Sequence, residues 1–166
     1  MIIDLFKIPV LINNIDIEKI KLKNKNFKKT WITQTPSTHD QKPEIDQNSI
    51  QYLTNTIASI LEEQIKHPFK IYIKDIWENY YINNDYQEPH LHVGCDFSFI
   101  IYKDVKESKT VFINPLQHYL KFYKNINYMF DEFFIPKCKT GHIIIFPSFL
   151  QHMVMKSSKQ KTISGN

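Results

Sequence analysis

The spacing of apolar residues changes near Pro68. Between residues 48 and 66, apolar side chains recur every three or four positions, which places them on one face of an α-helix. These positions are Ile50, Leu53, Ile57, Ile60, Leu61 and Ile65. Pro68 cannot continue a helix, because it lacks the backbone N–H and clashes with the preceding turn. The pattern therefore predicts an amphipathic helix over residues 48–66 that packs on the outside of a sheet.

Beyond Pro68 the apolar residues alternate with polar ones, as they do in a strand with one buried face. Phe69, Ile71 and Ile73 share one face of an extended segment. Further strands are expected over residues 76–82, 97–103, 110–114, 132–135, 142–146, 152–155 and 161–165, with a turn at 83–85. Many short strands separated by turns are typical of a jelly roll or barrel and not of a parallel sheet.

The chain before the predicted helix is expected to cover this β-structure without contributing chemistry. Residues 1–13 predict one or two edge strands, residues 14–22 a short helix capped by Asn14, and residues 30–33 a further strand. The fold class is therefore mainly β, with one buttressing α-helix and a short N-terminal helix.

The length is that of one domain. With 166 residues and a mass of 19.9 kDa, the chain can bury a single core. We expect residues 1–68 to supply the N-terminal strands and supporting helices, and residues 69–166 to form the barrel core of the same domain.

Charge and composition favour a protein without a nucleic-acid partner. All 21 basic residues are Lys, and the formal net charge is +4. The lysines are scattered except for a run from Lys19 to Lys29, which is typical of a solvated face. No signal-peptide pattern is present, and no apolar run approaches the ~20 residues that span a membrane.

The two cysteines agree with a cytoplasmic location, which would be the host cytoplasm for a viral protein. Cys95 and Cys138 are far apart and match no close-spaced zinc or redox motif. We therefore expect two free thiols in a reducing compartment and no association with a membrane.

Residues 88–96 contain the first candidates for metal ligands. In an extended strand His90 and His92 point to the same side, and neutral imidazole binds Fe, Zn, Cu and Ni. His152 is the natural third ligand, because it opens a strand after an apolar strand and a corner at Pro147. Three protein ligands leave coordination positions open, as a catalytic metal requires. The alternative is a pair of solvent-facing histidines on an edge strand.

These segments resemble the core of the iron- and 2-oxoglutarate-dependent oxygenases, and in particular a phage and bacterial branch similar to prolyl hydroxylases. The resemblance rests on residues 77–79, 86–92, 141–152 and 163–166. It implies a double-stranded β-helix, a cupin-like jelly roll, with Fe(II) and 2-oxoglutarate as cofactors. It also implies a dioxygenase that couples decarboxylation of the oxoacid to hydroxylation of a small-molecule or peptidyl substrate, including a prolyl side chain.

The chain departs from the family pattern at the metal ligands. The usual triad is His, one residue, Asp or Glu, and a distant His, whereas His92 stands where the carboxylate is expected. The site therefore consists of His90, His92 and His152, or it includes Asp96 as an alternative or additional ligand.

The resemblance also implies a pocket for 2-oxoglutarate, whose far carboxylate meets a basic side chain on the strand after the last His. Counting forward from His152 favours Lys161, whereas a register set by the terminal Asn166 places Gln160 there. Lys161 is the predicted partner, since Lys makes a charge-assisted bond to a carboxylate. The other side chains expected to bind the co-substrate are Tyr81, Asn79 and Ser164.

Two other functions fit the same residues. A cupin signature also matches the sequence, and it predicts a metalloenzyme that has Asp96 as a ligand and does not use 2-oxoglutarate. Its positions are His90, His92, Asp96, Gly141, Pro147 and His152. A non-catalytic jelly-roll module, such as a binding or virion protein, would have the same fold and incidental histidines. The sequence leaves the substrate and the oligomeric state open.

Residues 115–130 form an aromatic-rich insertion between two predicted strands. Its aromatic and imidazole side chains are His118, Tyr119, Phe122, Tyr123, Tyr128 and Phe130. Such a segment is either a packed loop or a lid over the substrate.

Overall fold

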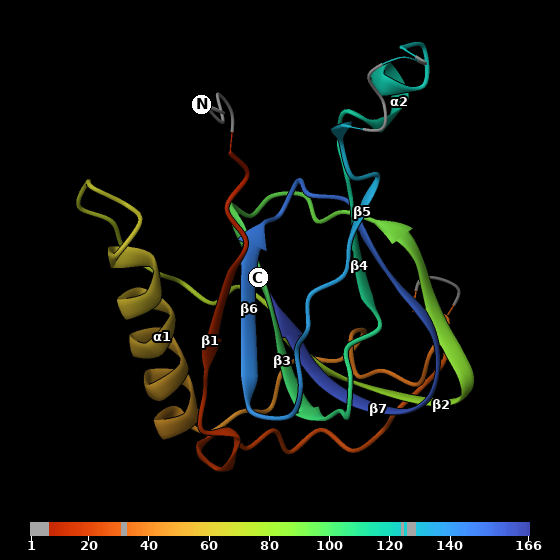
Figure 1. Ribbon diagram of the computed structural model, residues 1–166. Helices are drawn as coiled ribbons and strands as arrows, with labels where there is room; N and C mark the ends of the chain where they lie inside the picture. Colours follow the sequence, from red (N-terminus) through yellow and green to blue (C-terminus); the bar gives the residue numbers. More distant parts are fainter. Residues whose placement is uncertain (1–6, 31–32, 124, 126–128) are drawn as a thin grey trace.

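A computed structural model describes residues 7–30, 33–123, 125 and 129–166 of the chain. One long helix and a curled antiparallel sheet make up most of it (Figure 1). The elements are β1 (Leu11–Asn14), the 3-10 helix η1 (Ile17–Lys19), α1 (Gln47–Glu62), β2 (Ile76–His90), β3 (Phe97–Asp104), β4 (Thr110–Ile113), α2 (Gln117–Leu120), β5 (Phe133–Phe134), β6 (His142–Pro147) and β7 (His152–Gly165).

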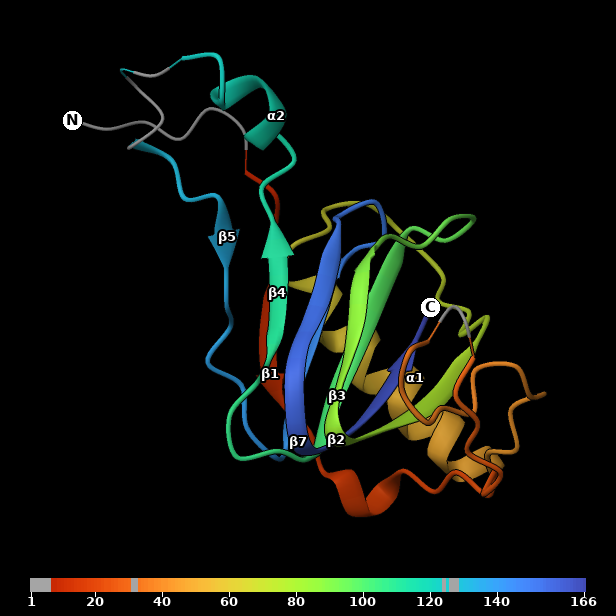
Figure 2. The same ribbon diagram turned by 90° about the vertical axis from the view of Figure 1, so that its right-hand side faces the viewer.

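The sheet is organised around β7. Six of its seven strands follow the order β1-β6-β3-β7-β4-β5, and the seventh, β2, pairs with β7 off this path. The C-terminal half of β7 pairs with β3 and its N-terminal half with β4, while β2 follows its other edge along most of its length. A strand that exchanges one neighbour for another must bend, and β2 and β7 curl together around the molecule (Figures 1 and 2). The result is the expected jelly roll, a double-stranded β-helix.

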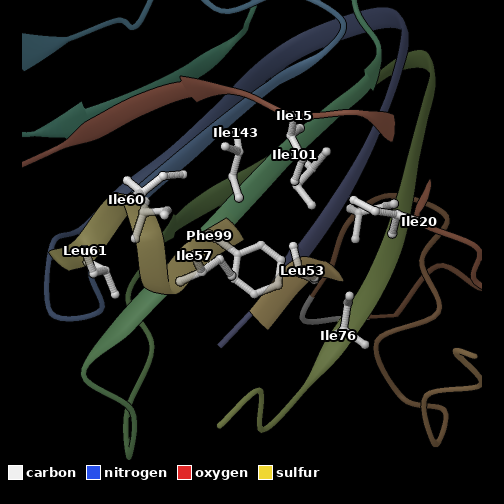
Figure 3. Close-up of a cluster of buried hydrophobic side chains, with 12 residues drawn as sticks. Ile15, Ile20, Leu53, Ile57, Ile60, Leu61, Ile76, Phe99, Ile101 and Ile143 are labelled. Carbon is white, nitrogen blue, oxygen red and sulfur yellow. The ribbon is translucent and has the colours of Figure 1, made fainter. Parts of the chain in front are cut away.

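Helix α1 covers one face of this sheet, as its apolar spacing predicted (Figure 3). Its buried side chains form one cluster with residues of β3 and β6, which includes Leu53, Ile57, Ile60, Leu61, Phe99, Ile101, Ile143 and Ile145. Each such burial contributes about 1.5–3 kcal/mol to stability. The side chain of Asp46 caps the helix by accepting a hydrogen bond from the backbone N–H of Ser49 at 3.1 Å. The helix ends at Glu62 and not at residue 66, although Ile65 still packs on the same cluster.

The opposite faces of β3 and β6 form a second core. Alternate residues of these strands point away from α1 and join a cluster that contains Ile100, Tyr102, Phe112, Ile144, Phe146 and Leu150. Both faces of β3 and β6 are therefore buried, which explains why their sequences are almost continuously apolar. The barrel interior lies on this second side.

The N-terminal region differs from its prediction in two respects. The expected helix over residues 14–22 is only the 3-10 turn η1, whose N-cap is Asp16. Asn14 instead ends β1, which pairs with β6. Asp16 takes over the cap because its side chain accepts from the N–H of Glu18, so the chain turns later than predicted. Residues 1–6 and 31–32 lie outside the described residues, and the strands expected there stay predictions in those parts.

Several strand boundaries also move. Residues 69–73 form no strand, and their apolar side chains pack directly on the α1 cluster. The predicted turn at 83–85 is an irregularity inside the single strand β2, where Asn83 and Asn84 have φ values of 53° and 63°. The two strands predicted over 152–155 and 161–165 are one strand, β7. β7 is nevertheless irregular between Val154 and Ser157, opposite Asp85 and Gln87, so its side chains alternate regularly only on either side of that point.

The aromatic insertion does not pack into the body of the protein. Helix α2 stands beyond the end of the sheet in both views (Figures 1 and 2). Tyr119 in α2 and the following Phe122 and Tyr123 are exposed, so the packed-loop interpretation is wrong for them. Tyr128 lies outside the described residues. Among the described residues, no helix is long and apolar enough to cross a bilayer.

Candidate metal and co-substrate site

Three histidines meet where β2 ends and β7 begins. His90 is the last residue of β2 and pairs with His152, the first residue of β7. His92 follows on the loop, where its backbone N–H donates to the carbonyl of Ser148 at 3.0 Å. One ligand atom from each of the three rings lies within 4.8 Å of the others, a geometry that can hold a metal ion. The structure therefore brings together the three histidines that the sequence singled out.

The hydrogen bonds of the rings decide which nitrogen of each ring could bind a metal. Nδ1 of His90 lies 2.7 Å from the carbonyl oxygen of Glu88, and Nδ1 of His152 lies 3.0 Å from that of Leu150. A carbonyl oxygen only accepts, so Nδ1 of each ring carries the proton and Nε2 keeps a free lone pair. This is the tautomer that a metal-binding histidine needs, and it is fixed before any metal binds.

His92 reaches the same state through side chains. Its Nδ1 lies 2.5 Å from Oδ1 of Asn166 and 3.1 Å from the hydroxyl of Ser98. Ser98 also donates to Asn166 at 2.9 Å and contacts the hydroxyl of Ser148 at 2.8 Å. The amide oxygen of Asn166 therefore accepts from both Ser98 and the ring of His92. No local pattern predicted the role of Asn166, because it lies seventy-four positions from His92 and sixty-eight from Ser98.

Burial keeps the three imidazoles neutral. It lowers the pKa of His152 to about 3, and the neighbouring His90 adds to the effect. Burial also lowers the pKa values of His90 and His92. Neutral rings offer lone pairs, so the site is ready for a cation at neutral pH.

A small inner cavity of about 20 Å³ adjoins the rings between the two layers of the barrel. Its wall on β7 consists of two sets of alternate residues, first His152 and Val154 and then Gln160, Thr162 and Ser164. The wall on β2 includes Trp77 and Tyr81. A volume of this size admits about one water molecule.

Lys161 does not line this cavity. It points to the other face of β7, where its Nζ lies 3.3 Å from Oε1 of Glu78. Lys103 contacts the same carboxylate oxygen at 3.0 Å. A shift of one position along a strand moves a side chain to the opposite face, so counting forward from His152 chose the wrong side. The register set by Asn166, which points to Gln160, agrees with the cavity wall.

The other expected co-substrate residues lie at the cavity. Tyr81 and Ser164 line it, and the Tyr81 hydroxyl donates to Oε1 of Gln87 at 2.8 Å. Burial raises the pKa of Tyr81, so this hydroxyl stays protonated. Asn79 lies behind them and donates through Nδ2 to Ser164 at 3.2 Å and to Thr162 at 3.4 Å.

Two amides beside the cavity have buried atoms without hydrogen-bond partners among the described residues. These atoms are Oδ1 of Asn79 and both Nε2 and Oε1 of Gln160. Each side chain is only 1% exposed. An unpaired buried polar group costs about 1–3 kcal/mol, so such groups in a cavity wall indicate a polar ligand.

A family model with the description "Putative 2OG-Fe(II) oxygenase" matches residues 75–164, which include all three histidines and most of β7. The chain belongs to the 2OG-Fe(II) oxygenase family. It is thus an enzyme that uses Fe(II) and 2-oxoglutarate, and the three histidines could hold the metal. No curated protein matches this oxygenase in sequence.

Solved structures support the fold of the oxygenase. It is similar to OsALKBH1, with a TM-score of 0.55 and 9% identity over 76% of this chain and 66% of that one. A 2OG-Fe(II) oxygenase family oxidoreductase from Burkholderia pseudomallei gives 0.53 and 10%, covering 96% and 72%. The viral collagen prolyl hydroxylase from Paramecium Bursaria Chlorella virus-1, in complex with 2OG, gives 0.52 and 13%, covering 79% and 76%.

Asp96 is placed away from the histidines. The chain turns at Gly94, whose φ is 74°, so residues 90–96 are not the straight strand that the alternation assumed. Asp96 is exposed, and the group of possible ligands does not include it. Its role as a ligand of the oxygenase stays a prediction.

A second, wider pocket of about 290 Å³ shares Trp77, Gln87, His90 and His92 with the inner cavity. Its remaining wall includes His39, Lys74, Asp75, Leu91 and Val93. The ring of His39 stands edge-on to Trp77, with 4.8 Å between the ring centroids. In the oxygenase the three histidines therefore lie between a closed inner cavity and an open outer pocket.

Proposed function

We propose that this oxygenase is a hydroxylase in which His90, His92 and His152 hold Fe(II) through Nε2. The observation that carries this proposal is the convergence of three neutral rings whose Nδ1 atoms already have acceptors. Bound there, Fe(II) and 2-oxoglutarate supply the redox chemistry that couples decarboxylation of the oxoacid to hydroxylation.

The part played by the chain itself is electrostatic and spatial. Three neutral ligands leave the full charge of the cation uncompensated, whereas a carboxylate ligand would neutralise part of it. A dianionic oxoacid is therefore attracted more strongly to this site than to one with a carboxylate ligand. We propose that Tyr81, Asn79 and Ser164 surround the co-substrate, and that the closed inner side excludes water from it.

We propose that the substrate enters from the outer pocket and is peptidyl, with a prolyl side chain as the first candidate. The pocket's rim supports this, because it combines exposed apolar side chains, Leu91 and Val93, with the charged Lys74 and Asp75. An open rim of this kind suits an extended chain better than an enclosed small molecule. The prolyl hydroxylase of the chlorella virus shares the fold.

The test is an anaerobic titration of the apo-protein with Fe(II) and then 2-oxoglutarate. A chelated oxoacid gives a weak visible charge-transfer band, which we expect for the wild type and not for His152→Ala. Admitting oxygen and proline-containing peptides should then release succinate in step with peptide hydroxylation. Iron binding without a band would instead support a cupin-type metalloenzyme, and failure to bind iron would refute the site.

We further propose that the protein acts in the cytoplasm. Cys95 and Cys138 are both free thiols, which is the usual state in a reducing compartment. Fractionation of the producing cells would test this, since recovery in a membrane or secreted fraction would contradict it.

A further inference from the structure

We propose that the carboxamide of Gln160, and not a cationic side chain, receives the distal carboxylate of the oxoacid. The proposal rests on the proposed function and specifies how its co-substrate pocket works. It implies that this pocket recognises the far end of the co-substrate by hydrogen bonds without an ion pair.

Gln160 lies in the cavity wall and has side-chain atoms that a ligand could pair. It belongs to the β7 residues that line the inner cavity and pairs through its backbone with Tyr81 on β2. The side chain is 1% exposed, yet neither Nε2 nor Oε1 has a partner among the described residues. A buried amide with both ends unpaired is rare in a folded protein, and a ligand carboxylate can pair its N–H groups.

The hydroxyl of Ser164 adds a second donor. Asn79 Nδ2 donates to Thr162 and Ser164, so their oxygens act as acceptors on that side. The Ser164 hydroxyl then has its own hydrogen to point into the cavity, whereas the Thr162 hydroxyl is hydrogen-bonded to Tyr81. Gln160, Thr162 and Ser164 are consecutive inward residues of one strand, so the amide and the Ser164 hydroxyl lie along the same line of β7.

No Lys lines the inner cavity among the described residues. The nearest candidates on the sheet, Lys103 and Lys161, share the carboxylate of the buried Glu78 on the opposite face. Lys74 belongs to the outer pocket and is exposed. The chain also contains no Arg, so an ion pair at the inner end would require Lys161 or Lys103 to cross the sheet.

The size of the cavity points to the same side chain. A space of about 20 Å³ is too small for a five-carbon acid, so lining side chains must move when the co-substrate enters. The Gln160 side chain has no hydrogen bond to break among the described residues, whereas Tyr81 would give up its bond to Gln87. The Gln160 amide is therefore the part of the cavity wall whose movement breaks the fewest hydrogen bonds.

The experiment measures oxoacid affinity from the visible band of the anaerobic Fe(II) complex, in the wild type and in variants. We expect Gln160→Lys to bind 2-oxoglutarate about tenfold or more tightly, since a charged donor replaces a neutral one. Gln160→Glu should weaken binding by at least about tenfold through like-charge repulsion. Lys161→Ala and Lys74→Ala are the matched controls and should leave the affinity within about twofold.

Unchanged affinity in both Gln160 variants, or a tenfold loss in either Lys control, would overturn the proposal. Iron affinity and far-ultraviolet circular dichroism identify variants that fail to fold. If the Gln160 variants do not fold, the wild type is titrated with 2,5-dioxopentanoate, whose far end accepts hydrogen bonds but carries no charge. We expect its affinity to lie within about tenfold of that of 2-oxoglutarate, and a preference above about a hundredfold for the dianion would indicate a cation instead.

Failure of the proposed function and failure of the Gln160 role give different experimental results. A wild type that binds iron but forms no band with either oxoacid refutes the proposed function itself. A wild type that forms the band, with affinity controlled by Lys161 or Lys74, refutes only the role of Gln160.

Discussion

The two faces of β7 differ in whether their charged and polar side chains have partners. On the face of β7 that points away from the cavity, here called the outer face, the buried carboxylate of Glu78 pairs with both Lys103 and Lys161, at 3.0 Å and 3.3 Å. On the inner face, which lines the cavity, the side chains are neutral, and within the part of the chain that the structure describes the Gln160 amide has no partner. A charge inside a protein must be paired within the fold, whereas a neutral donor can remain unpaired at a moderate cost until a ligand arrives. The outer face is complete in the free protein, and the inner face is arranged for its ligands.

The largest effect is expected on the inner face at the metal. Replacing His152 with Ala removes one of three ligands and should reduce iron affinity by more than about 100-fold, beyond the effect of losing a supporting hydrogen bond. Competition with a colorimetric chelator measures this affinity. The exposed His118→Ala is the control and should bind iron as the wild type does. Equal iron binding by both variants would contradict the assignment.

The neutrality of the inner face predicts a pH dependence for the metal-free protein. The pKa of His152 falls from 6.5 in the unfolded chain to about 3 in the folded one, so the unfolded chain binds the extra proton between these values. The free energy of unfolding should therefore decrease as pH falls below 6.5, by up to about 1.4 kcal/mol per pH unit from this group. Urea unfolding at pH 7, 6, 5 and 4 measures it. His152→Leu should show a weaker slope, and an identical slope would assign the effect to other groups.

On the outer face, Glu78→Gln should cost about 1–3 kcal/mol of stability, because two half-buried lysines lose their shared carboxylate. The expected loss of stability is smaller than for a fully buried ion pair, since water still reaches both lysines. Urea denaturation of iron-loaded protein measures the change. Glu107→Gln, which removes an exposed pair with Lys109, should change stability by less than about 0.5 kcal/mol. A marked loss of 2-oxoglutarate affinity in Glu78→Gln would show that the two faces are not independent.

A smaller effect is expected where His92 meets the end of the chain. Asn166→Ala removes the acceptor for Nδ1 and should weaken iron binding by about 10- to 100-fold without removing a ligand. Asn166→Asp keeps an acceptor oxygen at that place and should retain most of the affinity. Calorimetric titration with Fe(II) under argon distinguishes the two. Equal weakening in both variants would mean that the amide nitrogen matters, not the oxygen.

Much of the fold was predictable from local patterns. The helical spacing of Leu53, Ile57 and Ile60 and the alternation in β3 and β6 gave the correct elements, because burial of one face imposes its period on the sequence. Boundaries were less predictable. Asp16 and not Asn14 caps the N-terminal turn, and an irregularity inside β2 reads as a turn, because both depend on contacts that the local sequence does not contain.

The residues of the candidate site were also only partly identifiable from the sequence. His90, His92 and His152 were identifiable because two stand at strand spacing and the third opens a strand after a corner. Asn166 was not identifiable as the partner of His92, since seventy-four positions separate them. Nor did spacing alone decide between Lys161 and Gln160.

The sequence by itself determined the β-rich class, the helix that covers the sheet and the histidines that converge. Each of these depends on residue type and on a period of two or three to four positions. Only the tertiary structure decided which face of β7 meets the cavity, since a one-residue difference in register exchanges Lys161 for Gln160. It also decided which nitrogen of each ring is free, because the backbone must turn so that the carbonyls of Glu88 and Leu150 meet the rings two residues later, and because the acceptor for His92 comes from the distant Asn166.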